Sequence, residues 1–166
     1  MSLKIKLVRV DNRLLHATVA LNWNSFVNAN FIAVVDPTHT NDPFLAKVLQ
    51  LSFPRKNGVG IFSVDQLLEF LQADREEKCN LMIIFKNLEV LREAVDKGFE
   101  VPEVQLPYPA SRMMITSLEN YYTQAEITHI KHIQSKGINF FLQTAPYDSK
   151  DYSIFKSKRK MDENDQ

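Results

Sequence analysis

The chain has 166 residues, of which 45% are hydrophobic and 24% charged, as is typical of one globular domain with a substantial core. Lys plus Arg and Asp plus Glu each number 20, so the formal net charge is zero. This balance argues against a general binder of nucleic acid or anionic membranes, which needs a basic surplus to replace counterions. The zero net charge does not exclude a local basic patch.

The single cysteine, Cys79, excludes an internal disulfide and a thiol-based metal site. It suits a reducing cytoplasm, where we expect the protein to lie. The longest apolar runs, FIAVV at 31–35 and LMIIF at 81–85, have the length of strands and are too short to span a bilayer. The opening MSLKIK does not have the pattern of a signal peptide.

Short runs rich in β-branched residues alternate with longer stretches of helical spacing. The pattern predicts strands near 4–10, 31–36, 59–63, 81–85, 102–106 and 138–143, and helices near 14–27, 43–52, 64–73, 88–97 and 124–136. This order indicates an α/β fold: a single domain with a mostly parallel central sheet and helices on both faces. We expect the domain to cover residues 1–152 and a polar tail to cover 153–166.

Residues at the ends of the predicted helices support these boundaries. Ser63 with Gln66, and Thr123 with Glu126, have the spacing of capping boxes. Glycines 98 and 137 follow helical runs, where glycine suits a left-handed C-cap.

Polar residues follow the predicted strands, at the sheet edge where parallel α/β folds bind ligands. They are Asp11 and Arg13 after the first strand, Asp36 after the second, Ser63 after the third, and Lys86 and Asn87 after the fourth. Loops at this edge are polar in any such fold, so the pattern alone has little weight.

The first loop is more specific, because it places His16 in the first turn of a predicted helix. Free backbone N–H groups and the positive helix end favour an anion there, and they bias histidine toward its neutral, nucleophilic form by about 0.3–1 kcal/mol. Arg13 offers a planar fork to phosphate oxygens, and Asp11 can orient the imidazole or the loop backbone. A packing role for His16 stays an alternative.

The other histidines point less clearly to chemistry. His129 and His132 lie three apart on one predicted helix, but a solvated helix face is favoured over a metal site because no acidic or cysteine partner has matching spacing. His39 is interpreted as a turn residue. Glycine-rich nucleotide motifs, GxSxG and HExxH are all absent from the sequence, and we expect no cofactor and no metal.

The segment VRVDNRLLHATV (8–19) resembles the VRIDDRLIHGQV-like loop that opens the IIB components of the mannose/fructose/sorbose family of the bacterial phosphoenolpyruvate-dependent sugar phosphotransferase system. Further similar segments follow in order: VVDPTHTNDPF (34–44), FP with a following GV (53–59), IFKN (84–87) and KGINFFLQTAP (136–146). The similarity covers about residues 4–148.

The resemblance implies a mostly parallel α/β sheet and a phosphoryl relay. His16 is the position that takes phosphate from a phosphohistidine of the IIA component and passes it to a sugar at the membrane components IIC and IID. Asp11 and Arg13 then hold or orient the phosphoryl group. We expect Asn12, Asp36, Lys86 and Tyr108 at the rim of this site, no nucleic-acid partner, and no membrane span in this chain.

Three departures from the family pattern stand out. Asn12 replaces an aspartate, Ala17-Thr18 replaces Gly-Gln, and LPYPASRMM (106–114) replaces a glycine-rich segment. They leave open an alternative function, a diverged, non-catalytic binding or regulatory module on the same fold. An unrelated small-molecule enzyme is a third hypothesis, for which the sequence offers no motif.

Overall fold

A computed structural model describes residues 2–12, 23, 26–52, 58–107, 117–143 and 145–156. The strands are β1 (Leu3–Val10), β2 (Phe31–Val35), β3 (Gly58–Phe62), β4 (Cys79–Phe85), β5 (Glu103–Leu106) and β6 (Asn139–Leu142). The α-helices are α2 (Pro43–Ser52), α3 (Val64–Gln72), α4 (Leu88–Asp96) and α5 (Gln124–Ser135), with short 3-10 helices η1 (Leu118–Asn120) and η2 (Ser153–Phe155).

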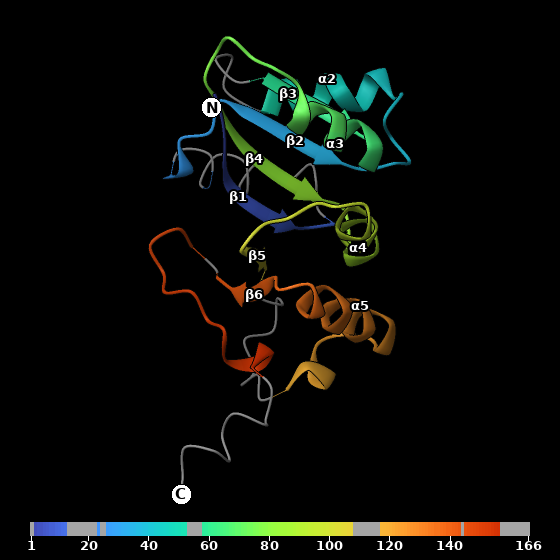
Figure 1. The fold of residues 1–166 in the computed structure, drawn as a ribbon, viewed down its shortest axis with the longest axis vertical. Helices are drawn as coiled ribbons and strands as arrows, with labels where there is room; N and C mark the ends of the chain where they lie inside the picture. Colours follow the sequence, from blue (N-terminus) through green and yellow to red (C-terminus); the bar gives the residue numbers. More distant parts are fainter. Residues whose placement is uncertain are drawn as a thin grey trace, which may run out of the picture.

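The strands form one sheet in the order β3-β2-β4-β1-β5-β6, and every neighbouring pair is parallel. Figure 1 shows this order, with β3 and β6 at opposite ends of the sheet. An isolated antiparallel bridge joins Leu142 of β6 to Asp151. The parallel α/β sheet predicted from the sequence is therefore confirmed. Its central strands β4 and β1 bring the segments after Phe85 and Val10 side by side at the carboxyl edge.

The core has two parts, one on each face of the sheet. Along β4, Met82 and Ile83 are both fully buried but belong to different clusters, because successive strand side chains point to opposite faces. Ile83 packs in the cluster that includes Leu67 of α3 and Leu91 of α4, whereas Met82 packs in the cluster that includes Leu49 of α2. Helices thus cover both faces, as the sequence predicts.

The predicted caps are present. Ser63 and Thr123 each accept a hydrogen bond from the backbone N–H three residues on, and Gln66 and Glu126 bond back, which completes two capping boxes. Gly98 and Gly137 have φ values of +104° and +88°, in the left-handed region that favours glycine after a helix. The predicted helix at 14–27 lies mostly outside the described residues; of its members, residues 23, 26 and 27 are helical.

Near the C-terminus, Phe155 of η2 is buried against Phe140 of β6, with ring centroids 5.7 Å apart. The side chain of Gln134 in α5 donates a hydrogen bond to the carbonyl oxygen of Phe155. The domain division at residue 152 stays a prediction, and residues 157–166 of the predicted tail lie outside the described part. Each helix within the described ranges is too short or too polar to cross a membrane.

Candidate functional site

The end of β1 carries a buried ion pair. Arg9 and Asp11 have side chains only 5% and 1% exposed, and Nη2 of Arg9 lies 3.1 Å from Oδ2 of Asp11, with a second contact from Nε at 3.3 Å. A buried carboxylate needs such a partner, since an isolated charge in the core is very costly. Asp11 is thus fixed where the chain leaves the sheet, and its N–H bonds to the carbonyl of Phe85 at the end of β4.

Arg9 also contacts Trp23, a residue that follows the segment after β1. Its guanidinium carbon lies 5.9 Å from the centroid of the Trp23 ring, and Trp23 is only 4% exposed. Asp11 precedes residues 13–22 and Trp23 follows them. One arginine therefore holds residues on both sides of the segment that carries His16.

A chain of buried amides extends this anchor across the sheet. Nη1 of Arg9 donates to Oε1 of Gln105 on β5 at 2.7 Å, and Gln105 donates to Oε1 of Gln143 at 3.2 Å. Gln143 in turn donates to the carbonyl oxygen of Asp148 at 2.7 Å. Because each donor has an acceptor, polar groups can lie inside the sheet edge without an unpaired charge.

A second polar cluster lies at the carboxyl end of β2, around Asp36, whose side chain is 1% exposed. Thr38 donates to Oδ1 of Asp36 through its backbone N–H at 3.0 Å and its hydroxyl at 2.6 Å. Nδ1 of His39 lies 2.6 Å from Oδ2 of the same carboxylate. Lys86, after β4, donates to the Thr38 hydroxyl at 3.0 Å and lies 3.5 Å from Oδ1 of Asp36.

These contacts set the charge of Asp36. Burial by itself raises the pKa of the carboxyl, but the hydrogen bonds from Thr38 and His39 and the charge of Lys86 outweigh it. The pKa of Asp36 therefore lies below its ordinary value, and the group is a carboxylate at neutral pH.

Asp11, Asn12 and Lys86 line one cavity of about 460 Å³ at the carboxyl edge. Its other lining residues come from the ends of β1 and β5 and from the N-terminal parts of α4 and α5: Val10, Asn87, Leu88, Glu89, Leu106, Pro107, Tyr122, Ala125, Glu126 and His129. Burial and then the charge of Glu126 raise the pKa of Tyr122, so its hydroxyl is a neutral donor in this wall.

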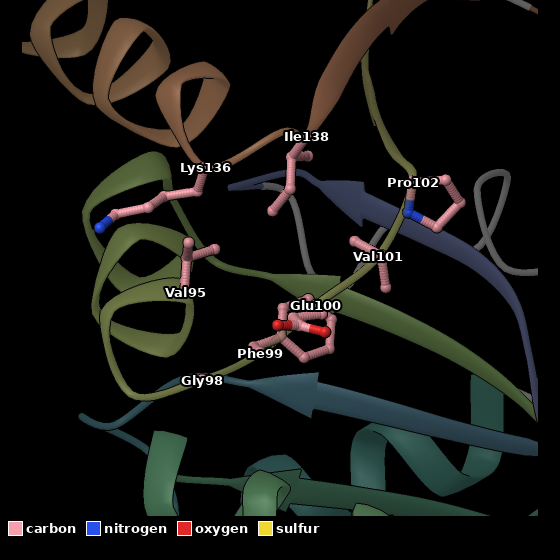
Figure 2. Close-up of a pocket in the computed structure, with 8 residues that line it drawn as sticks. All are labelled: Val95, Gly98, Phe99, Glu100, Val101, Pro102, Lys136 and Ile138. Atoms are coloured by element: carbon pink, nitrogen blue, oxygen red, sulfur yellow. The ribbon is translucent and has the colours of Figure 1, made fainter.

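Another cavity, of about 540 Å³, lies at the opposite edge of the sheet. Figure 2 shows that its walls come from the end of α4 and from the turns that precede β5 and β6. Among its described lining residues, Glu100 and Lys136 carry charge and the others are apolar or glycine. It does not contain any of the residues that the sequence predicts for the site.

The predicted site residues divide into two groups. Asp11, Asn12, Asp36 and Lys86 are at the same sheet edge, because β1, β4 and β2 are neighbours. The expected phosphorylation residue His16, its neighbour Arg13 and the rim residue Tyr108 lie outside the described residues.

Sequence reasoning did not identify two residues of this edge. Arg9 has the appearance of an ordinary strand residue, and its partner Gln105 lies 96 positions away. His39 is a turn residue, as interpreted, but it also pairs with a buried carboxylate. The spacing Asp36-x-x-His39 in a tight turn is the signal that could have revealed this pair.

His129 and His132 of α5 both contact side chains of α4. Arg92 donates to Nδ1 of His129 at 3.3 Å, and Nε2 of His132 lies 2.6 Å from Oδ1 of Asp96. Within the described ranges, no group of three or more His, Cys, Asp or Glu side chains is arranged to hold a metal ion.

Known proteins resemble this chain in sequence and in fold. A relative in Escherichia coli, N-acetylgalactosamine-specific phosphotransferase enzyme IIB component 1, is 26% identical over 152 residues, covering 89% of this chain and 94% of the relative. The E. coli mannose-specific EIIAB component is 23% identical over 148 residues, covering 88% of this chain but 46% of that longer protein.

The crystal structure of the IIB domain of the sorbose permease from Klebsiella pneumoniae has the same fold, with a TM-score of 0.76 at 18% identity over 96% of this chain and 97% of that one. The sequence model of the family described as "PTS system sorbose subfamily IIB component" matches residues 5–166. The chain therefore belongs to the sorbose subfamily of phosphotransferase-system IIB components, a family of sugar-transport transferases.

Proposed function

We propose that this protein is a phosphoryl carrier in which His16 accepts phosphate from a phosphorylated IIA component and passes it to a sugar at the membrane components IIC and IID. Arg13 binds the phosphoryl oxygens, and Asp11 orients the loop that carries Arg13 and His16. Asn12, Asp36, Lys86 and Tyr108 form the rim of the site. The reaction needs no cofactor, because the histidine itself carries the group.

The contacts of Arg9 with the residues that precede and follow residues 13–22 are the observation that supports this proposal most strongly. Arg9 holds Asp11 on one side of this segment and Trp23 on the other, both buried. A buried arginine is costly unless it is fully paired, so its use at this position is well explained by a need to fix the segment in place. Phosphoryl transfer between two histidines requires such positioning.

Charge at the sheet edge gives further support. Lys86, whose side chain is 32% exposed, lines the same cavity as Asp11 and Asn12 and brings an ammonium group to the carboxyl edge. A cation beside a transferring phosphoryl group stabilises the negative charge on its oxygens. We infer that Lys86 offers this local attraction to a phosphohistidine of a partner protein, although the formal net charge of the chain is zero.

The identity of the donor is supported by a relative. The E. coli mannose protein is named an EIIAB component, and this chain matches 46% of it. We infer that a IIA component, whether separate or fused, is the donor for this chain too. The sugar is not specified by the described residues, since relatives are named for N-acetylgalactosamine, mannose and fructose.

The test is transfer from phosphorylated IIA to the purified chain, followed on a denaturing gel. We expect the wild-type protein to acquire acid-labile phosphate and to lose it when IIC/IID vesicles and sugar are added. The His16→Ala variant should fold normally and stay unlabelled. A wild-type chain that takes no phosphate from several IIA components would contradict the proposal and favour the alternative of a regulatory module.

A further inference from the structure

The sheet ends at β3 on one side and at β6 on the other (Figure 1), and the outer sides of these two strands differ. At β6, Leu142 exchanges both of its backbone hydrogen bonds with Asp151, at 2.8 Å each, and Phe155 of η2 packs against Phe140. The chain that follows β6 therefore occupies that side of the sheet. Within the described ranges, the outer side of β3 has no such strand or bridge.

Two hydrogen bonds show which backbone groups of β3 are used inside the sheet. The N–H of Gly58 donates to the carbonyl oxygen of Asn30 at 3.0 Å, and the N–H of Asp36 donates to the carbonyl oxygen of Phe62 at 3.0 Å. Gly58 and Phe62 therefore both direct their backbone groups toward β2. Since this direction alternates from one residue to the next, the middle residue of the strand, Gly60, faces β2 as well.

The two remaining residues of the strand, Val59 and Ile61, direct their N–H and C=O groups to the outer side. These groups have no hydrogen-bond partner in the part of the chain that the structure describes. The side chains of both residues are half-buried and pack against the cluster that includes Leu49 and Met82. The core thus holds this strand in place while its outer backbone groups stay unpaired.

Strand β3 also lacks the features that usually keep an end strand from pairing with another chain. Natural proteins place charged residues, proline or a bulge at such strands. The sequence of β3 is GVGIF, and its register with β2 has no irregularity. A row of unpaired backbone groups on an uncharged, regular strand is suited to bind another extended strand.

A second copy of β3 pairs every outward group of the strand. In an antiparallel pair with a two-fold axis at Gly60, Val59 lies opposite Ile61 of the second copy, and each of these pairs exchanges two backbone hydrogen bonds. Their β-branched side chains become cross-strand neighbours, which stabilises a sheet. Gly60 meets its own copy at the position where antiparallel strands come closest, about 4.5 Å between Cα atoms.

The other face of the strand is self-complementary too. Phe62 lies opposite Gly58 of the second copy in this register, so a large side chain meets a residue without one. The ring of Phe62 is only partly buried and lies 5.2 Å from that of Phe70 in α3, measured between centroids. Pairing therefore removes further aromatic surface from water.

We propose that this protein forms a homodimer in which two β3 strands pair antiparallel and join the two sheets into one. Because residues 151–155 occupy the other end of each sheet, the assembly closes at two copies. Two strands, β2 and β4, separate β3 from β1, so the pairing does not involve the carboxyl ends of β1 and β4. The inference does not depend on the proposed carrier function.

Amide hydrogen exchange, followed by NMR at rising protein concentration, tests the pairing in the unmodified chain. The N–H groups of Val59 and Ile61 should exchange about 10-fold more slowly once nine-tenths of the chains are paired, because only the monomer exposes them. Gly60 and Phe62 are internal controls that should exchange slowly at every concentration. Sedimentation from about 1 µM to about 1 mM gives the fraction of paired chains.

Two substitutions at one position separate backbone pairing from side-chain contact. Val59→Pro removes an outward N–H that the sheet does not use, and an end strand tolerates proline there. Val59→Thr keeps this N–H and a β-branched side chain. We expect Val59→Pro to stay monomeric at about 1 mM and Val59→Thr to dimerise within about 10-fold of the wild-type dissociation constant.

A wild-type chain that remains monomeric up to about 1 mM overturns the inference. A dimer in which the Val59 and Ile61 amides exchange at unchanged rates overturns it too, because the chains then associate through another surface. These measurements need no substitution, so they decide the question even where Val59→Pro does not fold. A chain that dimerises but takes no phosphate contradicts the carrier function alone.

Discussion

At the scale of single residues, the first segment of the chain contains two arginines with different expected roles. Arg9 is buried and paired with Asp11, whereas Arg13 is predicted to bind phosphate. The two side chains have the same chemistry, so a comparison of their substitutions separates support of the fold from transfer.

We predict that Arg9→Met destabilises the protein by about 3–5 kcal/mol, because it removes a partner of a buried carboxylate. Arg13→Gln should instead slow phosphotransfer by raising its activation free energy by about 1.5–3 kcal/mol, with little change in melting temperature. Urea unfolding and single-turnover transfer from IIA give the two quantities. A large loss of stability in Arg13→Gln with near-normal transfer would identify a structural arginine instead.

A second residue-scale prediction concerns acid stability. The pKa of Asp36 is lower in the folded chain than its ordinary value of 3.8, because hydrogen bonds from Thr38 and His39 and the charge of Lys86 outweigh burial. Such a carboxylate stabilises the fold above its unfolded pKa, and this contribution is lost as pH falls through the folded pKa.

Asp36→Asn should therefore reduce stability most at neutral pH, and its difference from the wild type should shrink below about pH 4. The measurement is urea unfolding at a series of pH values. The control is Asp74→Asn, a change at an exposed carboxylate, which should stay within about 0.5 kcal/mol of the wild type at each pH. A constant deficit for Asp36→Asn at all pH values would contradict the account.

At the scale of secondary structure, the N-cap of α5 starts the helix that forms part of the wall of the 460 Å³ cavity. Thr123 accepts from the N–H of Glu126, and Glu126 and His129 of this helix line the cavity. We predict that Thr123→Ala destabilises the protein by about 1 kcal/mol, as the loss of an N-cap usually does.

The same helix provides the comparison for this prediction. Thr128→Ala makes an identical change at an exposed position, where the hydroxyl bonds back to the carbonyl oxygen of Gln124. It should alter the free energy of unfolding by less than about 0.5 kcal/mol. Equal losses in the two variants would show that the capping box is not the source of stability.

The sequence predicts most elements because their signals are local. Continuous apolar runs such as LMIIF predict a strand buried on both faces, and Ser63 and Thr123 mark helix starts. The strand order is not predictable in this way, since β1 pairs with β4 and β5 through contacts far apart in sequence. The same reason explains why the contacts of Arg9 are not predictable from the sequence, whereas the positions of Asp36 and Lys86 at the carboxyl edge follow from their places after strands.

At the scale of the whole molecule, the sheet separates two hydrophobic clusters, and we predict that they unfold together. Ile32 of β2 and Ile130 of α5 are both fully buried, but they belong to different clusters on opposite faces. We predict that Ile32→Val and Ile130→Val each cost about 0.5–1.5 kcal/mol. Their combined cost should equal the sum within about 0.5 kcal/mol, because they share no contact.

Urea unfolding of the two single variants and the double variant gives these values. A single transition with an unchanged slope in all of them is expected for one cooperative domain. Two separate transitions, or strong non-additivity, would contradict the picture of two cores joined by one rigid sheet.

The central claim is that this chain carries phosphate on one histidine. The most direct measurement is to load the wild-type protein from phosphorylated IIA and to map the acid-labile phosphate by mass spectrometry of its peptides. We predict phosphate on His16 alone, and none on the His16→Ala variant. Phosphate on His39, His129 or His132, or label retained by His16→Ala, would contradict the account.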